Sequence, residues 1–229
     1  MLNSKYLAEA IGTFFLVFIG AGTVIASNNV LAVAIATGLT LIVMVYATGH
    51  VSGAHINPAV TAAMWATNRM KSREAFIYVI SQLIGAVVAG IFLLYIYSAQ
   101  PVNLGATVLG AGVSLGAGML VELLLTFMLV FVVFAVTVDN RAPRSVYGAA
   151  IGLTLIAAIL MGGTLTGAAL NPARAFGPAV AAWHWEAHVI YWIGPLVGGI
   201  AAGLVYSKFF LRKPKAKKKK FLSARKESE

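Results

Sequence analysis

Apolar runs of about 20 residues recur six times along this chain, and they constrain its fold more than any other feature. A helix rises about 1.5 Å per residue, so a run of this length crosses the ~30 Å hydrocarbon core of a bilayer. Only 10% of the 229 residues are charged, whereas a soluble domain carries about 25%. The sequence therefore predicts an all-α membrane protein whose six spanning helices lie at about residues 6–27, 31–49, 75–97, 117–138, 146–164 and 188–210.

Two further apolar stretches, at about 57–66 and 172–182, are too short to cross the hydrocarbon core. They are either interfacial loops or half-spans that enter the membrane and return on the same side. The positions of these two stretches within the chain decide between the alternatives, because each occupies the same place in one half of an internal repeat.

The repeat consists of four blocks that recur in the same order at an offset of 113 or 114 residues. The matching pairs begin at Glu9 and Glu122, Gly38 and Gly152, Asn57 and Asn171, and Gly85 and Gly198. Each copy contains three spans, an odd number, so the second copy crosses the membrane upside down relative to the first. Inverted repeats place equivalent segments symmetrically about the bilayer midplane. We therefore expect one domain over 1–211, with repeat one at about 5–97 and repeat two at about 117–211.

Positive charge is distributed in a way that orients the chain. If both termini are cytoplasmic, sixteen of the seventeen Lys and Arg residues lie on the cytoplasmic side, as the positive-inside rule requires. Much of the net charge of +10 lies in the segment 212–229, which we interpret as a disordered cytoplasmic tail that contacts anionic lipid. The exception is Arg174, and an arginine at membrane depth marks a functional site by default.

The tripeptide Asn-Pro-Ala opens both short stretches, as Asn57-Pro58-Ala59 and as Asn171-Pro172-Ala173. Proline suits the first position of a helix, where its missing N–H is not needed. The preceding Asn caps the helix through its side-chain oxygen, which leaves its NH₂ group to donate to whatever lies in front of the helix. One copy would indicate only a capped helix, but two copies at equivalent repeat positions indicate a paired pore motif.

The segments around these tripeptides, 52–61 (SGAHINPAVT) and 167–174 (GAALNPAR), make the chain resemble the aquaporin or major intrinsic protein family over about residues 5–210. Archaeal and tonoplast-type water channels are particularly similar to it around 171–194. The resemblance implies an hourglass fold of six transmembrane helices and two re-entrant half-helices, and a homotetramer with one pore per subunit. It also implies a narrow selectivity filter built from Thr37, Ile159, Ala168 and Arg174.

The extended stretches before the half-helices must line a wet path, because an unsatisfied carbonyl facing lipid costs several kcal/mol. We expect a ladder of backbone acceptors there, at Gly53, Ala54, His55, Gly167 and Ala169. Glu9 and Glu122 are interpreted as acceptors for loop N–H groups that hold this ladder in place, with pairing to a neighbouring helix as the alternative. Two facing helix N-termini, each equivalent to roughly +0.5 charge, together with Arg174 would exclude cations and protons.

The filter residues weaken the case for exclusive water selectivity. Strict water channels of this family usually carry an aromatic residue where this chain has Thr37, and His where it has Ile159. Glycerol facilitators usually carry Asp after the arginine, where this chain has Ala175. The sequence thus predicts a passive channel for water and for small neutral solutes such as ammonia, urea, hydrogen peroxide or glycerol.

Two alternatives of other classes remain open at this point. A secondary transporter also uses inverted repeats and broken helices, and a non-conducting membrane scaffold would conduct nothing. An enzyme is not expected, because no nucleophile, base and orienting group converge in the sequence. We expect no cofactor and no nucleic-acid partner. We also expect no metal site, since the chain has no cysteine and no third ligand lies near His50 and His55. His184 and His188, with Glu186 between them, lie on an outer loop where metal binding is the alternative that we do not favour. A plasma membrane is the expected location.

Overall fold

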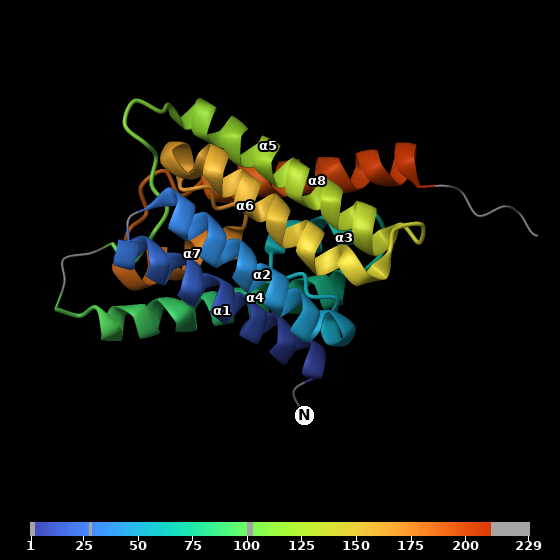
Figure 1. Cartoon of the computed structure of the whole chain (residues 1–229), viewed down its shortest axis with the longest axis horizontal. Coiled ribbons are helices and arrows are strands. Elements are labelled where there is room, and N and C mark those ends of the chain that lie inside the picture. The colour runs from blue at the N-terminus through green and yellow to red at the C-terminus, as the bar shows by residue number, and fades with distance from the viewer. Residues whose placement is uncertain (1–2, 28, 100–102, 212–229) are drawn as a thin grey trace, which may run out of the picture.

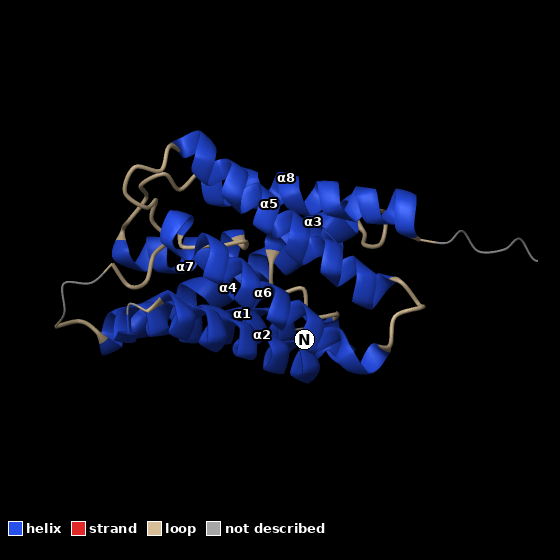
Figure 2. Cartoon of the chain, turned by 45° about the horizontal axis from the view of Figure 1, so that its top comes forward, coloured by secondary structure: helices blue, strands red, loops and turns tan. Residues whose placement is uncertain are grey.

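The computed structural model describes residues 3–27, 29–99 and 103–211, so the predicted tail 212–229 lies outside the described residues. Within these ranges the chain forms eight α-helices and no strand (Figure 1). Their bounds are α1 Ser4–Ser27, α2 Val30–Ser52, α3 Pro58–Ala66, α4 Ser72–Ile96, α5 Leu115–Val133, α6 Tyr147–Thr166, α7 Pro172–Ala182 and α8 Ile190–Val205. Figure 2 shows the long helices lying along one axis, with most of the loops at the two ends of the bundle.

Six of these helices are long and apolar enough to cross a membrane, and they coincide with the six predicted spans to within a few residues. Both α5 and α8 continue into a short π-helical segment, Phe134–Val138 and Tyr206–Phe210, so their apolar stretches extend to Val138 and Phe210. The prediction of an all-α membrane protein with six spanning helices is confirmed.

The two short stretches form α3 and α7, of 9 and 11 residues, which lie toward opposite ends of the bundle (Figure 1). Each packs against a long helix of the opposite repeat, α3 against α8 and α7 against α4. They are therefore half-spans inside the bundle and not interfacial loops, as the hourglass arrangement requires.

Glycines allow equivalent helices of the two repeats to cross closely. A Cβ at Gly85 would lie 2.1 Å from the carbonyl oxygen of Ala10, and a Cβ at Gly198 would lie 2.1 Å from the carbonyl oxygen of Leu123. Leu123 follows Ala10 by 113 residues, the same offset that separates the two glycines. The same packing thus occurs once in each half, which is the structural counterpart of the repeat in the sequence.

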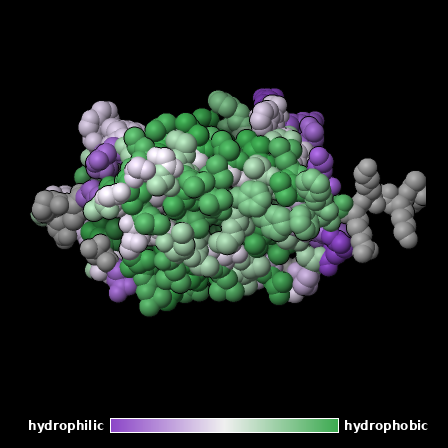
Figure 3. All heavy atoms as spheres, turned by 90° about the horizontal axis from the view of Figure 1, so that it is seen from above, coloured by the Kyte–Doolittle hydropathy of each residue, from purple (hydrophilic) through white to green (hydrophobic). Residues whose placement is uncertain are grey.

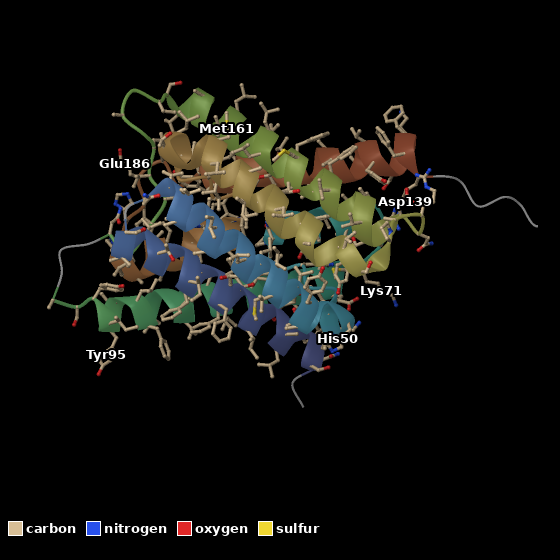
Figure 4. All side chains as sticks on the ribbon, in the orientation of Figure 1. His50, Lys71, Tyr95, Asp139, Met161 and Glu186 are labelled. Atoms are coloured by element: carbon tan, nitrogen blue, oxygen red, sulfur yellow. The ribbon has the colours of Figure 1, made fainter. Side chains whose placement is uncertain are left out.

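The outer surface carries a broad apolar belt between two polar ends (Figure 3). Large hydrophobic side chains of several spanning helices are exposed there, among them Leu39, Val43, Leu124, Leu153 and Met161. One end, which we call the basic end, carries the loops with Lys71 and Asp139, while Tyr95 and Glu186 lie toward the opposite end (Figure 4). An apolar belt of this extent on a six-span bundle makes the chain an integral membrane protein.

Candidate conduction pore

Both half-helices begin in the same way. Asn57 and Asn171 have extended backbone dihedrals, and each side-chain oxygen accepts a hydrogen bond from the backbone two residues on, at Ala59 N (2.8 Å) and Ala173 N (3.0 Å). Asn171 accepts a second one from the N–H of Arg174 at 3.3 Å. A proline occupies the first helical position in each case. The capped helix start inferred from each tripeptide is thus present in both halves.

The asparagine amides also bond across the centre of the protein. Nδ2 of Asn57 donates to the carbonyl oxygen of Leu170, and Nδ2 of Asn171 donates to the carbonyl oxygen of Ile56, both at 2.9 Å. The sequence predicted that each NH₂ group donates to whatever lies in front of its helix, and one such acceptor is the opposite loop. Each NH₂ has two hydrogens, so this cross-link uses one and leaves the other for a molecule in front of the helix.

The loop before α3 is held by the buried carboxylate of Glu9. Its Oε1 accepts from the backbone N–H of His55 at 2.9 Å and from the Ser52 hydroxyl at 2.7 Å. Its Oε2 accepts from the N–H of Ile56 at 2.6 Å and from Nε2 of Gln82 at 2.8 Å. Four donors compensate a charge whose burial would otherwise be very costly.

Glu122 takes the equivalent place in the second half. Its Oε1 accepts from the hydroxyl of Thr166 at 2.7 Å and from the N–H of Ala169 at 2.9 Å, and its Oε2 accepts from the N–H of Leu170 at 2.8 Å. The residue that corresponds to Gln82 is Pro195, which has no side-chain donor. The acid of the second half therefore has three donors where the first has four.

These acids hold backbone that is unfavourable by itself. The non-glycine residues Ala54, Ile56, Ala168 and Leu170 have φ between 44° and 54°, in the left-handed region that costs an L-residue roughly 1–2 kcal/mol. Such residues persist where surrounding contacts enforce them, typically at functional sites. Here the enforced conformation alternates along both loops and fixes the direction of successive peptide groups beside an internal cavity.

That cavity brings the predicted site residues together. It has a volume of about 40 Å³ for the centres of water-sized molecules, and one water needs about 10–15 Å³. The non-helical segments 53–56 and 167–170 line it, together with apolar residues such as Leu41, Val45 and Val133. The predicted filter and pore-motif residues that line the cavity come from α2, α6, α7 and the loops before the two half-helices: Thr37, Asn57, Ile159, Ala168, Asn171 and Arg174.

Arg174 lies in the first turn of α7 and is only 6% exposed. Its Nη1 donates to the carbonyl oxygen of Gly105 at 2.9 Å, which is part of the loop between α4 and α5. Among the described residues it forms no ion pair. A guanidinium has five N–H donors, so most of its hydrogen-bonding capacity is available to a molecule in the cavity.

Two tyrosines support the loops, and sequence analysis did not assign them this role. Tyr78 donates from its hydroxyl to the carbonyl oxygen of Ser52, and Tyr191 donates to that of Thr166, both at 2.8 Å. Tyr191 is fully buried, and its hydrogen bond fixes the second loop. The signal that identifies both is the repeat itself, because Tyr78 and Tyr191 are 113 residues apart.

His55 and His188 lie at different places in the structure and have different contacts. Nδ1 of His55 lies 3.1 Å from Oγ1 of Thr61, inside the support of the first loop. His188 packs between aromatic rings at the end opposite the basic one, where burial and the nearby His184 lower its pKa. In the described part of the chain no three His, Cys, Asp or Glu side chains come together as metal ligands would.

At the basic end, an ion pair within the α5–α6 loop is hydrogen-bonded to the π-helical segment that follows α8. Arg141 donates through Nε to Oδ1 of Asp139 at 2.9 Å and through Nη2 to Oδ2, and the same Nη2 donates to the carbonyl oxygen of Phe210 at 2.8 Å. The hydroxyl of Tyr206 donates to Oδ2 of Asp139 at 3.1 Å. Hydrogen bonds from Arg141 lower the pKa of Asp139 well below its usual range, and the Asp139 carboxylate in turn raises the pKa of Arg141.

The chain is similar in sequence and in structure to known proteins along most of its length. The family model described as major intrinsic protein matches residues 2–206. Aquaporin TIP4-4 from Zea mays is 43% identical over 219 residues, covering 90% of this chain and 86% of that protein. The lens fiber major intrinsic protein of Lithobates pipiens is 44% identical over 206 residues, covering 87% of this chain and 78% of its own. The X-ray structure of the aquaglyceroporin from Plasmodium falciparum matches with a TM-score of 0.81 at 24% identity, covering 90% of this chain and 96% of that one.

The chain belongs to the major intrinsic protein family, a family of membrane channels and not of enzymes. It is a passive transmembrane channel for water and small solutes, and the secondary-transporter alternative is not favoured.

Proposed function

We propose that the cavity between the two half-helices is the conduction path for water, and that ammonia, urea, hydrogen peroxide and glycerol are the small neutral solutes that also pass. The observation that carries this proposal is the convergence of both asparagines and Arg174 on one cavity that the non-helical segments 53–56 and 167–170 also line. Polar backbone at membrane depth is tolerated only where it is buried in protein or lines water.

Permeation would use the backbone acceptors as partial replacements for a hydration shell. Carbonyls at Gly53, Ala54, His55, Gly167 and Ala169 form the ladder, and the facing apolar wall offers a permeating molecule nothing to bind. A water molecule then passes from acceptor to acceptor without being trapped. Glu9 and Glu122 act at a distance from the path by holding the ladder in its left-handed conformations.

Ion exclusion would come from the positive ends of α3 and α7 and from Arg174. A helix N-terminus is equivalent to roughly +0.5 charge, and two such ends meet near the centre beside Asn57 and Asn171. The remaining N–H of each asparagine would donate to the oxygen of a passing water. That orientation breaks the hydrogen-bonded chain that proton transfer needs, while neutral molecules pass.

The filter would be formed by Thr37, Ile159, Ala168 and Arg174. Three of the four have small or apolar side chains that do not compete for the permeant. Arg174 is the only charged side chain among the four, a composition that suits a neutral molecule with an apolar face and a hydrogen-bonding edge. This composition supports solute permeation in addition to water flux.

Stopped-flow light scattering on proteoliposomes tests the proposal. Vesicles challenged with sucrose report water efflux, and parallel challenges with glycerol and with urea report re-swelling as solute enters. We expect fast shrinkage in sucrose and fast re-swelling in both solutes. Shrinkage without re-swelling would restrict the channel to water, and a response no faster than that of empty liposomes would favour a non-conducting scaffold.

We also propose the arrangement in the membrane: a single domain over 1–211, both termini cytoplasmic, and a homotetramer in the plasma membrane. Basic residues at one end of the bundle and the apolar belt support this arrangement (Figures 3 and 4). Similarity to TIP-type aquaporins makes an internal membrane the alternative location. Light scattering of the detergent-purified protein tests the tetramer, and fluorescence of a tagged chain in its own cell distinguishes the two membranes.

A further inference from the structure

Gly20 on α1 lies directly behind the filter side chain of Thr37 on α2. A Cβ at Gly20 would lie 3.0 Å from Oγ1, 3.3 Å from Cγ2 and 3.7 Å from Cβ of Thr37. Ordinary carbon contacts are about 3.5–4.0 Å, so a methyl group at this position would push the threonine away. Gly20 itself does not line the cavity, whereas Thr37 does.

This glycine differs from those at the helix crossings. At Gly85 and Gly198 an added Cβ would meet the backbone of the facing helix, so those glycines set how closely two helices approach. At Gly20 all three nearest atoms belong to one side chain. The equivalent position in the second repeat is Val133, which shows that the inverted copy accommodates a branched side chain there. The glycine is therefore matched to Thr37 and not to a helix crossing.

In the part of the chain that the structure describes, the hydroxyl of Thr37 also lacks a hydrogen bond that would fix the orientation of the side chain. Other threonines of the spanning helices, such as Thr40, Thr48 and Thr154, donate to the carbonyl oxygen four residues earlier, at 2.7–2.8 Å. Oγ1 of Thr37 is buried and has no hydrogen-bond partner among the described residues. No internal hydrogen bond holds the side chain in place; its position depends on packing, with Gly20 on one side and the cavity on the other.

We propose that Gly20 is a positioning residue that sets the width of the filter, by leaving the space into which Thr37 withdraws from the conduction path. The inference rests on the proposed role of Thr37 in the filter. Both Oγ1 and Cγ2 face the glycine, so either a rotation about χ1 or a shift of the whole side chain moves atoms toward the cavity when a Cβ is added. A larger residue at position 20 narrows the channel without touching the permeant.

The test compares permeability ratios of reconstituted variants. Gly20→Ala is expected to lower glycerol and urea permeability relative to water by about tenfold, the scale on which one methylene discriminates in an apolar site. Gly22→Ala, two residues along the same helix, is the matched control, because its Cβ would meet only Leu93 Cδ2 at an ordinary 3.4 Å. It is expected to leave the ratio unchanged.

Combining Gly20→Ala with changes at Thr37 distinguishes a positioning role of Gly20 from a general destabilisation of the channel. In Thr37→Ala the atoms that Gly20→Ala would strike are absent, so adding Gly20→Ala there is expected to change neither flux. With Thr37→Ser, which lacks only Cγ2, the effect is expected to be intermediate. An equal loss in the Thr37→Ala background, or an equal loss in Gly22→Ala, would overturn the proposal.

Failure of the proposed solute range remains distinguishable from failure of this inference. If the unmodified channel passes water but neither glycerol nor urea, the solute range is wrong, and the role of Gly20 is then judged from water flux alone. The positioning role of Gly20 predicts slower water flux in Gly20→Ala than in Gly22→Ala. It also predicts equal water flux in Thr37→Ala and in the double variant that combines Gly20→Ala with Thr37→Ala. Equal water flux in the two glycine variants would reject it.

Discussion

Arg174 and Gly105 are joined by a hydrogen bond of 2.9 Å from the guanidinium Nη1 to the backbone carbonyl oxygen. The two residues are 69 positions apart, and the glycine belongs to the α4–α5 loop, outside both half-helices. This loop packs closely on α1, because a Cβ at Gly105 would lie 2.5 Å from the carbonyl oxygen of Ala21. Arg174, the cation of the proposed filter, is thus held by a connecting loop that the repeat does not include.

Replacing Gly105 by alanine should displace that loop. The residue has a φ of +68° and no room for a Cβ, so both strain and a clash result. We expect Gly105→Ala to lower the free energy of unfolding by about 2 kcal/mol or more and to slow water flux. Gly112→Ala is the control, since Gly112 has a φ of +77° with nothing within 4 Å; it should cost only about 1–2 kcal/mol of strain. Thermal unfolding in detergent and stopped-flow water flux provide the measurements, and equal effects of the two variants would contradict this expectation.

Neutralising Glu122, the loop-supporting acid of the second repeat, should damage the channel. Glu122→Gln replaces a carboxylate oxygen by an NH₂ group that opposes the N–H of Leu170 or Ala169, leaving a buried donor unsatisfied at a cost of about 1–3 kcal/mol. We expect a lower unfolding temperature and a water flux reduced by about tenfold.

Leu123→Ala, beside the acid, is a poor control because that residue packs on Gly198; Leu124→Ala is better, since Leu124 is exposed on the apolar belt. Unchanged flux in Glu122→Gln would show that the ladder does not depend on the carboxylate.

Changing Asn57 to aspartate separates capping from donation. An aspartate keeps the oxygen that accepts from Ala59 N, so the start of α3 should remain capped. It lacks the donor to the carbonyl oxygen of Leu170 and places negative charge between the two helix ends. We expect the folded channel to persist while its exclusion of cations weakens, measurable as sodium or proton leakage with a fluorescent dye inside proteoliposomes. Asn57→Ala, which removes cap and donor but adds no charge, should leak less.

Stability in acid should depend on Asp139. Donors from Arg141 lower the pKa of this carboxyl in the folded protein, so its stabilising contribution is fully present above the ordinary aspartate pKa of about 4. The contribution is lost as the pH falls further, toward the lowered folded-state value. We expect unfolding temperatures of the unmodified chain and of Asp139→Asn to differ most near neutral pH and to converge below about pH 4. A difference that grows in acid would contradict the sign of the shift.

The elements that depend on local pattern could be predicted from the sequence. Six apolar runs gave six spans, and Asn57 and Asn171 marked the starts of both half-helices to the residue, because capping and proline preferences act within one turn. Glu9 and Glu122 were identified as acceptors since each is a carboxylate in an apolar span. The internal repeat provided the remaining evidence, because it showed that the Asn-Pro-Ala motif occurs at equivalent positions in both halves.

Contacts between distant segments could not be predicted in this way. Nothing in the residues around Gly105 indicates that its carbonyl oxygen accepts from Arg174, because any residue has a carbonyl. The bonds from each asparagine to the opposite loop depend on where the two repeats meet, which spacing along one chain does not specify. Tyr78 and Tyr191 were accessible in principle, by extending the repeat alignment to hydroxyl donors.

The hydrogen bonds from Asn57 and Asn171 to the carbonyls of the opposite loops have a consequence for biosynthesis. When the ribosome has made the first repeat and inserted it, Asn57 has no Leu170 carbonyl to bond, and the Ile56 carbonyl has no amide to accept from. The donor and acceptor that complete the centre are translated more than a hundred residues later. At about 5–20 residues per second, the first half waits several seconds in the membrane with its core unfinished. The nascent chain therefore acquires its final centre only after the second copy has entered the bilayer from the other side.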